Sequence, residues 1–470
     1  MPERMIKGPV SGAKRLTAGA AILTARLSRF FLRLSGRGAT ALPGKLALKI
    51  SPDLLRLLVQ QRMVFLVTGT NGKTTAVRIL CSILSSAGYE VITNPSGANL
   101  DTGLTTTLIS EHKKLRQTAG TKLALVFEID EAFFARLAAD LKPSYCVVTN
   151  FFRDQLDRFG ELAHTRDLIL KGILASDAKV ILCADDSLCA SMGREMKHDV
   201  FYFGMGQAGM RQTDSPPAGQ ESAFCTFCGT RYTYEATSYG HLGIFSCAGC
   251  GYKRPEADLE FVVSQQLPRS LNLSFSWRHQ QIEASLPIPG VHNAYNAAAA
   301  VLTALAAGIR LEKAGAALGQ VQAAFGRMER FSVGNKDVCL ILVKNPVGMD
   351  RALEFVKMAH DRGGLMFLLN ANDPDGRDVS WIWDANFEDH VVGDFVGVSG
   401  VRCDDMALRL YYAGWHQDEI RVSRQALGLF DQLLEHCDDG KCLYILPNYT
   451  AMLDLRAGLA ERYQLKAFWR

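Results

Sequence analysis

The sequence predicts an α/β protein of more than one domain, built from mainly parallel sheets with helices on both faces. Three observations indicate this class. The chain has 470 residues, which is too long for a single compact domain. Hydrophobic residues make up 48% of it and charged residues 21%, as in globular proteins with sizeable cores. From about residue 62, short apolar runs alternate with longer helical stretches, which is the pattern of strand–helix–strand units.

The N-terminal end is basic and is expected to be helical. Its first forty residues contain eight lysines and arginines against Glu3 alone, a charge of about +7 that leaves about −3 for the rest. Residues 16–34 have the spacing of an amphipathic helix interrupted by arginines. Such a helix either packs on the protein's own core or lies on an anionic membrane surface, and both interpretations stay open. We predict a basic N-terminal helical segment over residues 1–55.

Two features predict a cytoplasmic chain without a transmembrane helix. No stretch of eighteen uncharged apolar residues occurs, and residues 16–34 lack a convincing cleavage site for a signal peptide. Four of the twelve cysteines form two C-x-x-C pairs and the others lie scattered in apolar contexts, which favours a reducing compartment. The slightly acidic balance beyond residue 40 also argues against a nucleic-acid partner.

A first alternation of predicted strands and helices occupies the middle of the chain. Four apolar runs are expected to form buried strands: MVFLVT (63–68), KLALVFEI (122–129), SYCVVTN (144–150) and KVILCA (179–184). Glycine, proline and serine in residues 204–222 predict a linker. Beyond it, residues 271–277 and 282–288 alternate like antiparallel strands, and the alanine-rich residues 293–308 predict a closely packed helix. We expect one central domain over residues 56–330.

GTNGKTT, residues 69–75, follows a predicted strand and begins a predicted helix. This is the context of a phosphate-binding loop, in which backbone N–H groups converge on an anion at the positive end of a helix. Lys73 would reach the β- and γ-phosphates of a nucleotide, and Thr74 would ligate Mg²⁺. On the loop alone, a glycine-containing turn with an incidental lysine is the open alternative.

The cysteine pairs have the spacing of a metal site. The pattern C-x₂-C-x₁₈-C-x₂-C comprises Cys225, Cys228, Cys247 and Cys250. Four thiolates favour a closed, tetrahedral, structural Zn²⁺ site, which leaves no open position for catalysis. Gly229 and Gly251 permit the tight turns of a zinc ribbon, which we predict as an insertion at about 221–258. Two disulfides or free thiols are the alternative.

A second alternation of predicted strands and helices begins near residue 338. Its expected strands are VCLILV (338–343), GLMFLLN (364–370), DFVGVSG (394–400) and KCLYILP (441–447). This alternation predicts a separate C-terminal α/β domain with Rossmann-like layering over residues 331–470.

The loop and four further signatures resemble the Mur ligase family, the ATP-dependent amide-forming enzymes of peptidoglycan synthesis. The family's loop is G-T-N-G-K-[ST]-[ST]. VFEIDE carries Glu128 at a strand end, and TNFFRDQLDRFGE (149–161) resembles T-N-x-x-x-D-H-x-D, with Gln155 in place of the usual histidine. GVHNAYNAAAA carries Asn293, and FGRMER carries Arg327. The five signatures occur in the family's order over about 260 residues.

The resemblance implies a Mur-ligase-like P-loop ATPase domain that uses ATP and Mg²⁺. Thr74 and Glu128 would hold Mg²⁺, and Asn293 would contact adenine. Lys73 and Arg327 would be catalytic, because their cations stabilise the charge of the transferred phosphoryl group. The residues implied to contact the nucleotide are Thr70, Asn71, Gly72, Lys73, Thr74, Thr75, Asn293 and Arg327.

The inserted ribbon narrows the resemblance to the MurT group of this family. ALPGKLALKISPDLL, NPVGM, DGRDVSWIWDANFE and PNYTAM are similar to that group, and LVKNP (342–346) replaces the D-x-A-H-N-P of typical Mur ligases. The resemblance implies amidation of the α-carboxylate of D-glutamate in the lipid II stem peptide, giving D-isoglutamine through an acyl phosphate. It also implies ammonia from a GatD-type glutaminase partner in a heterodimer, close to the inner face of the membrane.

A glutaminase of this type needs a nucleophilic cysteine on a sharp elbow, and none of the twelve cysteines has those flanking residues. Glutamine hydrolysis is therefore expected on another chain. The resemblance implies that Asp378 orients the partner's catalytic histidine, with Asp375 as runner-up. The alternative role for Asp378 is to cap a helix over VSWIWD, and Trp381 and Trp383 are expected to pack in an interface or a core.

Two other classes stay open from the sequence. The first is a stand-alone amino-acid ligase of the Mur or folylpolyglutamate type, which would turn over ATP with an amino acid and no partner. The second is an ATPase fused to a zinc-ribbon nucleic-acid module, whose ATPase activity DNA or RNA would stimulate.

Overall fold

The computed structural model describes residues 12–34, 41–95, 98–116, 122–152, 162–197, 199–213, 223–267, 270–321, 329–390 and 396–463. Contacts divide the chain into two compact units. The first comprises Met1–Phe152 with Glu161–Val321, and the second comprises Arg153–Gly160 with Gln322–Arg470.

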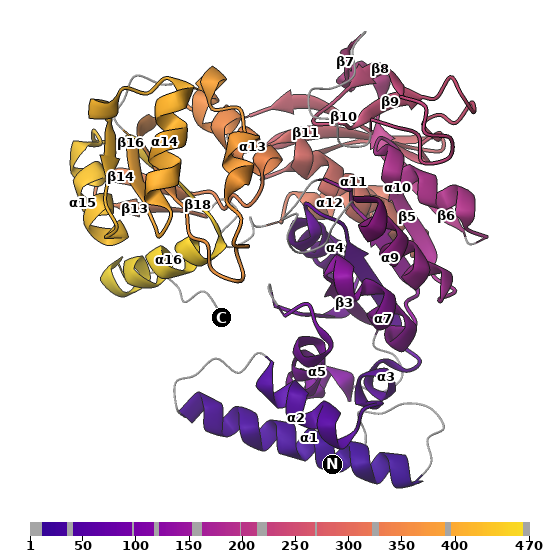
Figure 1. Ribbon diagram of the computed structural model, residues 1–470. Coiled ribbons are helices and arrows are strands. Elements are labelled where there is room, and N and C mark those ends of the chain that lie inside the picture. The colour runs from indigo at the N-terminus through magenta and orange to yellow at the C-terminus, as the bar shows by residue number, and fades with distance from the viewer. Residues whose placement is uncertain are drawn as a thin grey trace. The chain divides into compact units, whose positions relative to one another are not determined.

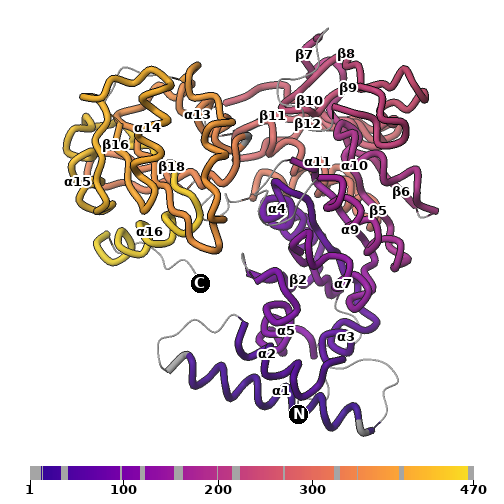
Figure 2. The backbone as a smooth tube through the Cα atoms, viewed as in Figure 1, coloured from indigo at the N-terminus to yellow at the C-terminus, as the bar shows by residue number. Residues whose placement is uncertain are grey.

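The first unit is built on a nine-stranded sheet in the order β12-β11-β10-β6-β5-β4-β1-β3-β2 (Figures 1 and 2). The strands are β1 (Met63–Thr68), β2 (Tyr89–Thr93), β3 (Lys122–Glu128), β4 (Tyr145–Val148), β5 (Lys179–Cys183), β6 (Val200–Met205), β10 (Leu259–Gln266), β11 (Leu271–Trp277) and β12 (Gln280–Leu286). Strands β1 to β6 and β10 are parallel, and β11 and β12 extend the sheet as antiparallel strands. The predicted strands are confirmed.

Helices connect the parallel strands because parallel neighbours need a crossover connection. They are α4 (Lys73–Ser86), α5 (Asp101–Ser110), α6 (His112–Leu115), α7 (Glu131–Leu141), α9 (Leu162–Leu174) and α10 (Ser187–Met192). Two further helices, α11 (Val291–Ala306) and α12 (Leu311–Leu318), follow the antiparallel strand β12. The predicted alanine-rich helix is α11, which is buried from Asn293 to Thr303 and packs against α4. Its small side chains allow this close approach.

Three helices precede the sheet: α1 (Gly12–Leu34), α2 (Leu42–Ile50) and α3 (Leu54–Val59). The inner face of α1 is fully buried at Ala18, Ala21, Ile22 and Ala25, and α1 packs against α2 and α5. The helix therefore does pack on the protein's own core, as one of the two sequence interpretations had it. Among the described residues, no helix is long and apolar enough to cross a membrane.

Three short antiparallel strands form a separate small sheet: β7 (Arg211–Gln212), β8 (Thr233–Thr237) and β9 (Gly243–Ser246). The prediction of a linker over 204–222 is wrong for its first part, because residues 204–205 end β6 and residues 211–212 form β7. Gly204 is required by packing instead, since a Cβ there would lie 2.6 Å from Asp185 Oδ1. Residues 214–222 lie outside the described ranges.

The second unit is a six-stranded sheet in the order β13-β14-β18-β15-β16-β17. Its strands are β13 (Glu329–Val333), β14 (Lys336–Leu340), β15 (Arg362–Leu368), β16 (Val396–Ser399), β17 (Ile420–Val422) and β18 (Cys442–Pro447). All are parallel except β13. The helices are α13 (Pro346–Met358), α14 (Cys403–Ala413), α15 (Ala426–His436) and α16 (Tyr449–Tyr463).

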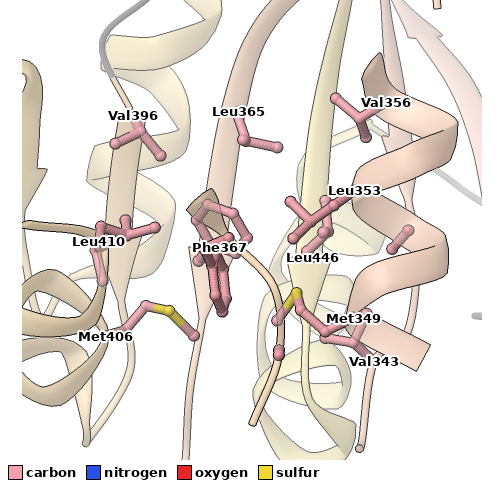
Figure 3. Close-up of a cluster of buried hydrophobic side chains, with 14 of the residues drawn as sticks. Val343, Met349, Leu353, Val356, Leu365, Phe367, Val396, Met406, Leu410 and Leu446 are labelled. Carbon is pink, nitrogen blue, oxygen red and sulfur yellow. The ribbon is translucent and has the colours of Figure 1, made fainter. Parts of the chain in front are cut away.

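Each face of this sheet has its own core because successive side chains of a strand point to opposite faces. On β15, Leu365 and Phe367 face α13 and α14, where they meet Leu353 and Met406 (Figure 3). Met366 and Leu368 face the opposite side and pack with residues of α15 and α16. Two buried faces account for the continuous apolar run in the sequence.

Candidate functional site

The loop after β1 lies where the strand order of the first sheet reverses. Strand β1 is flanked by β3 and β4, and such a switch point is where open α/β sheets bind ligands. The loops after β1 and β4 are tied together: the backbone N–H of Thr70 donates to Asn150 O at 2.9 Å. The N–H of Asn71 donates to Asn150 Oδ1 at 2.9 Å, and Asn150 Nδ2 donates to Asn71 O at 3.1 Å. Asn150 therefore holds the loop in shape.

Two glycines allow the loop its conformation. Gly69 has φ +117° and Gly72 has φ +86°, which side chains rarely adopt. A Cβ on Gly69 would lie 2.4 Å from Thr149 Oγ1, and a Cβ on Gly72 would lie 1.9 Å from Asn296 Oδ1. Both glycines are thus required by close approach as well as by backbone angle.

Lys73 begins α4 and is buried with its ammonium turned back into the loop. Its Nζ donates to Gly69 O at 2.6 Å and to Glu131 Oε1 at 2.8 Å. Glu131, at the start of α7, is also buried. The sequence interpretation did not single out Glu131, although it stands in the same VFEIDE segment as Glu128. An acidic residue shortly after a strand, at the first position of a helix, was the available signal.

Thr74 and Glu128 form the second pair at this edge. Thr74 Oγ1 donates to Glu128 Oε2 at 2.7 Å, and Asn99 Nδ2 donates to Glu128 Oε1 at 3.3 Å. Asn94 holds the backbone of Glu128 through bonds of 2.9 and 3.0 Å to its N–H and C=O. A hydroxyl and a carboxylate in contact are the hard oxygen donors that Mg²⁺ prefers, so the predicted magnesium ligands fit that ion.

Asn293 lies close to the same loop through its neighbour on α11. Asn296 Nδ2 donates to Asn293 Oδ1 at 3.2 Å, and the Asn296 side chain packs against Gly72. Asn293 Nδ2 donates to Pro289 O at 2.7 Å, which fixes the amide's orientation. The structure therefore brings together Thr70 to Thr75, Glu128 and Asn293, as the sequence predicted. Arg327, Asp154, Gln155 and Asp157 lie outside the described residues.

The four predicted zinc ligands converge at one end of the small sheet. Cys225, Cys228, Cys247 and Cys250 offer sulfur atoms that all lie within 4.8 Å of one another. The two knuckles repeat one geometry: the N–H of Gly229 donates to Cys225 O at 2.8 Å, and that of Gly251 donates to Cys247 O at 2.9 Å. The φ angles of these glycines are +71° and +72°. Four thiols so placed fit a tetrahedral Zn²⁺ site.

The turn between β8 and β9 connects this ribbon to the phosphate loop. His241 packs on the ring of Phe152 with centroids 4.6 Å apart, and Tyr239 stacks on the same ring at 5.5 Å. The N–H of Phe152 donates to Thr70 Oγ1 at 3.1 Å. A second tie is the ion pair of Arg254 Nε with Asp185 Oδ1 at 2.7 Å; burial raises the pKa of Asp185, which Arg254 opposes. Tyr239 and His241 thus brace the loop that follows β4, and Arg254 ties the ribbon to the loop that follows β5.

In the second unit, the two candidate aspartates, Asp375 and Asp378, differ in burial and in their hydrogen-bond partners. Asp375 is buried and accepts hydrogen bonds from the backbone N–H of Thr450, at 2.8 Å, and from its hydroxyl. Asp378 is exposed and accepts the N–H of Ser380 at 2.8 Å, a bond that lowers the pKa of its carboxyl group. Asp375 therefore anchors the loop, whereas Asp378 presents a carboxylate at the surface.

Known proteins match these features over nearly the whole chain. The family model of the Mur ligase middle domain matches residues 67–245, and that of the MurT ligase C-terminal domain matches residues 342–452. The subunit MurT of lipid II isoglutaminyl synthase (glutamine-hydrolyzing) from Streptococcus pneumoniae R6 is 38% identical over 452 residues, covering 94% of this chain and 96% of the relative. The chain belongs to the MurT family. The Staphylococcus aureus COL subunit MurT is 32% identical and covers 94% of this chain and 98% of its own length.

Solved structures agree on the fold of this MurT family member. A pseudomurein peptide ligase type C from Methanothermus fervidus aligns with a TM-score of 0.66 and 20% identity, covering 87% of this chain and 81% of that one. The predicted fold class, Mur-ligase-like with a C-terminal α/β domain, is confirmed.

The sequence interpretation assigned no role to a set of buried amides at the edge of the second sheet. Asn448, after β18, accepts the N–H of Asn370 at 3.0 Å and donates to Asn370 O at 2.7 Å. Asn370, after β15, accepts the N–H of Val401 at 2.9 Å. These bonds join the loops at the carboxyl ends of three parallel strands, β15, β18 and β16. Asparagines directly after two predicted strands were the available signal.

The contact between Gly72 and Asn296 leads to a matched pair of variants in this MurT chain. Gly72→Ala should raise the dissociation constant for ATP at least about tenfold, because its methyl group collides with Asn296 and distorts the loop. Gly88→Ala has nearly the same backbone angle, φ +88°, but no atom within 4 Å of the new methyl group. It should lower the melting temperature by a few degrees and leave nucleotide affinity unchanged. Calorimetric titration checks both, and equal affinities in the two variants would contradict the assignment.

Proposed function

We propose that the chain is the synthetase subunit of a lipid II isoglutaminyl synthase. In this proposal it amidates the α-carboxylate of D-glutamate in the lipid II stem peptide to D-isoglutamine, with ATP and with ammonia from a GatD-type glutaminase. The observation that carries it is the near-full-length similarity to MurT subunits, together with a complete phosphate loop around Lys73. Residues 56–330 would form the ATP-binding domain, and residues 331–470 the MurT-type domain.

The first half-reaction is phosphoryl transfer. A carboxylate oxygen of the substrate attacks the γ-phosphorus of ATP, the bond from that phosphorus to the bridging oxygen breaks, and ADP leaves with an acyl phosphate formed. Lys73 is placed to stabilise the charge on the phosphate oxygens, and the N–H groups at the start of α4 point the positive end of that helix at them. Burial strengthens these interactions because water screens them less.

Metal ions would have two separate roles. Thr74 and Glu128 would hold Mg²⁺, which neutralises phosphate charge when bound. Cys225, Cys228, Cys247 and Cys250 would hold a structural Zn²⁺, and because four protein sulfurs would fill a tetrahedral site, no open position would remain for catalysis. Asn293 would contact adenine, and Arg327 would approach the γ-phosphate; these two assignments rest on the family resemblance.

In the second half-reaction, ammonia attacks the acyl carbon, the carbon–oxygen bond to phosphate breaks, and the nitrogen loses a proton. The ammonia would come from the partner, whose catalytic histidine Asp378 would orient. An exposed carboxylate with a lowered pKa suits that role, since it stays ionised beside a protonated histidine. Asp375 suits it less, because Thr450 occupies both of its oxygens.

An exposed apolar surface near Asp378 supports partner binding. Trp383, Leu408, Tyr411 and Tyr412 are 48%, 51%, 56% and 67% exposed, and the rings of Trp383 and Tyr412 lie 5.7 Å apart. Residues 408, 411 and 412 share one face of α14. Aromatic side chains clustered in this way are typical of protein interfaces.

We place the chain in the cytoplasm, at the inner face of the cell membrane where lipid II is held.

Reconstitution tests the proposal against both rival functions. The chain is mixed with a GatD-type glutaminase, ATP, glutamine and lipid II, and the stem peptide is weighed by mass spectrometry. The expected product has one hydroxyl replaced by an amine, and ammonium salt in place of glutamine should give it without the partner. ATP turnover with a free amino acid alone would favour a stand-alone ligase. Turnover stimulated only by DNA or RNA would favour the nucleic-acid module.

A further inference from the structure

The N-terminal helix α1 has two apolar faces on opposite sides. Its inner face is the buried set of Ala18, Ala21, Ile22 and Ala25. Its outer face consists of Leu16, Leu23, Leu27 and Phe30, which are 69%, 55%, 50% and 59% exposed. At 3.6 residues per turn these four lie within about 60° of one another, opposite the inner face. A helix that only covers the core needs one apolar face, so the second face calls for a separate explanation.

Further exposed apolar residues lie on α1 itself and on α2, which packs against it. Phe31 on α1 is 63% exposed and its ring lies 5.8 Å from that of Phe30, and α2 adds Leu42 and Ile50 at 47% and 41%. In the described part of the chain, seven of the twenty exposed large apolar residues belong to these two helices. Figure 1 shows α1 along the outside of the first unit, with α2 and α5 on one side of it. Exposed apolar groups gathered on this scale mark an interaction site.

The charges around this surface identify the kind of partner. Neither α1 nor α2 contains an aspartate or a glutamate. Arg15 and Arg26 lie within about 20° of one another along one flank of the outer face, and Arg29 lies further round the helix, on the side of the inner face. Exposed Lys45 and Lys49 add two further cations on α2. An apolar stripe with a cationic border matches an anionic lipid surface, where the stripe enters the acyl boundary and the cations meet phosphate groups.

We propose that the outer face of α1, bordered by the cations of α1 and α2, docks the chain on an anionic phospholipid membrane. Leu16, Leu23, Leu27, Phe30 and Phe31 enter the bilayer interface, and the inner face of α1 remains packed on α2 and α5. The two interpretations of the sequence are therefore compatible, because the helix uses one face for each. This inference goes beyond the proposed function, since it requires neither ATP, lipid II nor a glutaminase.

Co-sedimentation with vesicles tests the docking surface without the reaction. The full chain should bind vesicles of phosphatidylglycerol and phosphatidylcholine more tightly than vesicles of phosphatidylcholine alone, and raising the salt concentration should weaken binding. The triple variant Leu23→Ser, Leu27→Ser, Phe30→Ser should reduce the partition coefficient at least about tenfold. Its altered side chains are exposed, so circular dichroism should show an unchanged fold.

A matched control separates this face from general surface hydrophobicity. The variant Leu174→Ser, Met358→Ser, Val422→Ser removes three exposed apolar side chains, 49%, 56% and 46% exposed, that lie on other elements. It should bind vesicles as the unaltered chain does. Equal vesicle binding by the two triple variants would overturn the proposal. So would a change of oligomeric state in the α1 variant without a change in vesicle binding, which would assign the face to a second copy of the chain.

The amidation assay distinguishes failure of this inference from failure of the proposed function. With lipid II in detergent micelles, the α1 variant should retain ammonium-driven amidation, because no residue of the phosphate loop is altered. Loss of vesicle binding with retained amidation supports docking through α1. Retained vesicle binding overturns it, whatever the outcome of the amidation assay.

Discussion

Lys73→Met is expected to abolish ATP turnover with either nitrogen source. The variant removes the cation that the structure places inside the phosphate loop, 2.6 Å from Gly69 O. Removal of such a group from a buried site costs roughly 10³-fold or more in rate, since water does not replace the lost charge. The measurement is ADP release with ammonium salt and lipid II. Lys179→Met, at a half-exposed lysine on β5, is the matched control and should leave the rate within about twofold.

Glu131 complicates the simplest form of this experiment. In Lys73→Met its carboxylate stays buried without the ammonium at 2.8 Å, which destabilises the fold in its own right. The double variant Lys73→Met, Glu131→Gln also removes the buried negative charge of Glu131. Its melting temperature should return toward that of the unaltered chain, and it should stay inactive. Recovery of activity together with stability would contradict the catalytic assignment of Lys73.

Asp378→Asn should block amidation driven by glutamine and spare amidation driven by ammonium. Replacing the aspartate that orients a catalytic histidine costs about 10³- to 10⁴-fold, because the amide no longer stabilises the imidazolium form. The ammonium-driven rate should stay within about twofold, since the phosphate loop is unaltered. Both rates come from the same mixture of chain, glutaminase, ATP and lipid II, with the nitrogen source exchanged.

Asp375→Asn is the informative comparison for Asp378. Its carboxylate is buried and bonded to Thr450, so the substitution should lower the melting temperature and impair the glutamine-driven reaction only through the loop. Asp384→Asn, an exposed change in the same segment, should have no effect on either rate. A selective loss of glutamine-driven activity in Asp375→Asn, with Asp378→Asn active, would exchange the two roles.

Features with a local sequence signal could be predicted. Ten strands of the two sheets followed from apolar or alternating runs, whereas β2, β6, β10, β13 and β17 were not predicted. The phosphate loop followed from a glycine-containing turn between a strand and a helix. The convergence of the four cysteines followed from two C-x-x-C pairs, and the glycines behind them do adopt positive φ angles. In each case the residues that make the feature lie close together in the chain, or their spacing is constrained by the chemistry of one ion.

Contacts between distant residues could not be predicted in the same way. Glu131 meets Lys73 across 58 positions, and Asn296 meets Gly72 because α11 packs on α4. Residues 204–212 looked like a linker because glycine is common in turns. Gly204 instead lies in β6, where a side chain would collide with Asp185. The second apolar face of α1 was visible as apolar residues, but only burial separates an inner from an outer face.

The catalytic role proposed for the first unit depends on activation of a carboxylate by phosphorylation, and an isotope experiment tests this most directly. Lipid II carrying ¹⁸O in both oxygens of the D-glutamate α-carboxylate is amidated with ATP and ammonium, and the released phosphate is analysed by mass spectrometry. The account predicts one ¹⁸O atom in each phosphate and one in each amide, because the carboxylate oxygen that attacks phosphorus leaves with it. Amide formation with unlabelled phosphate would contradict the acyl phosphate and with it the role given to Lys73.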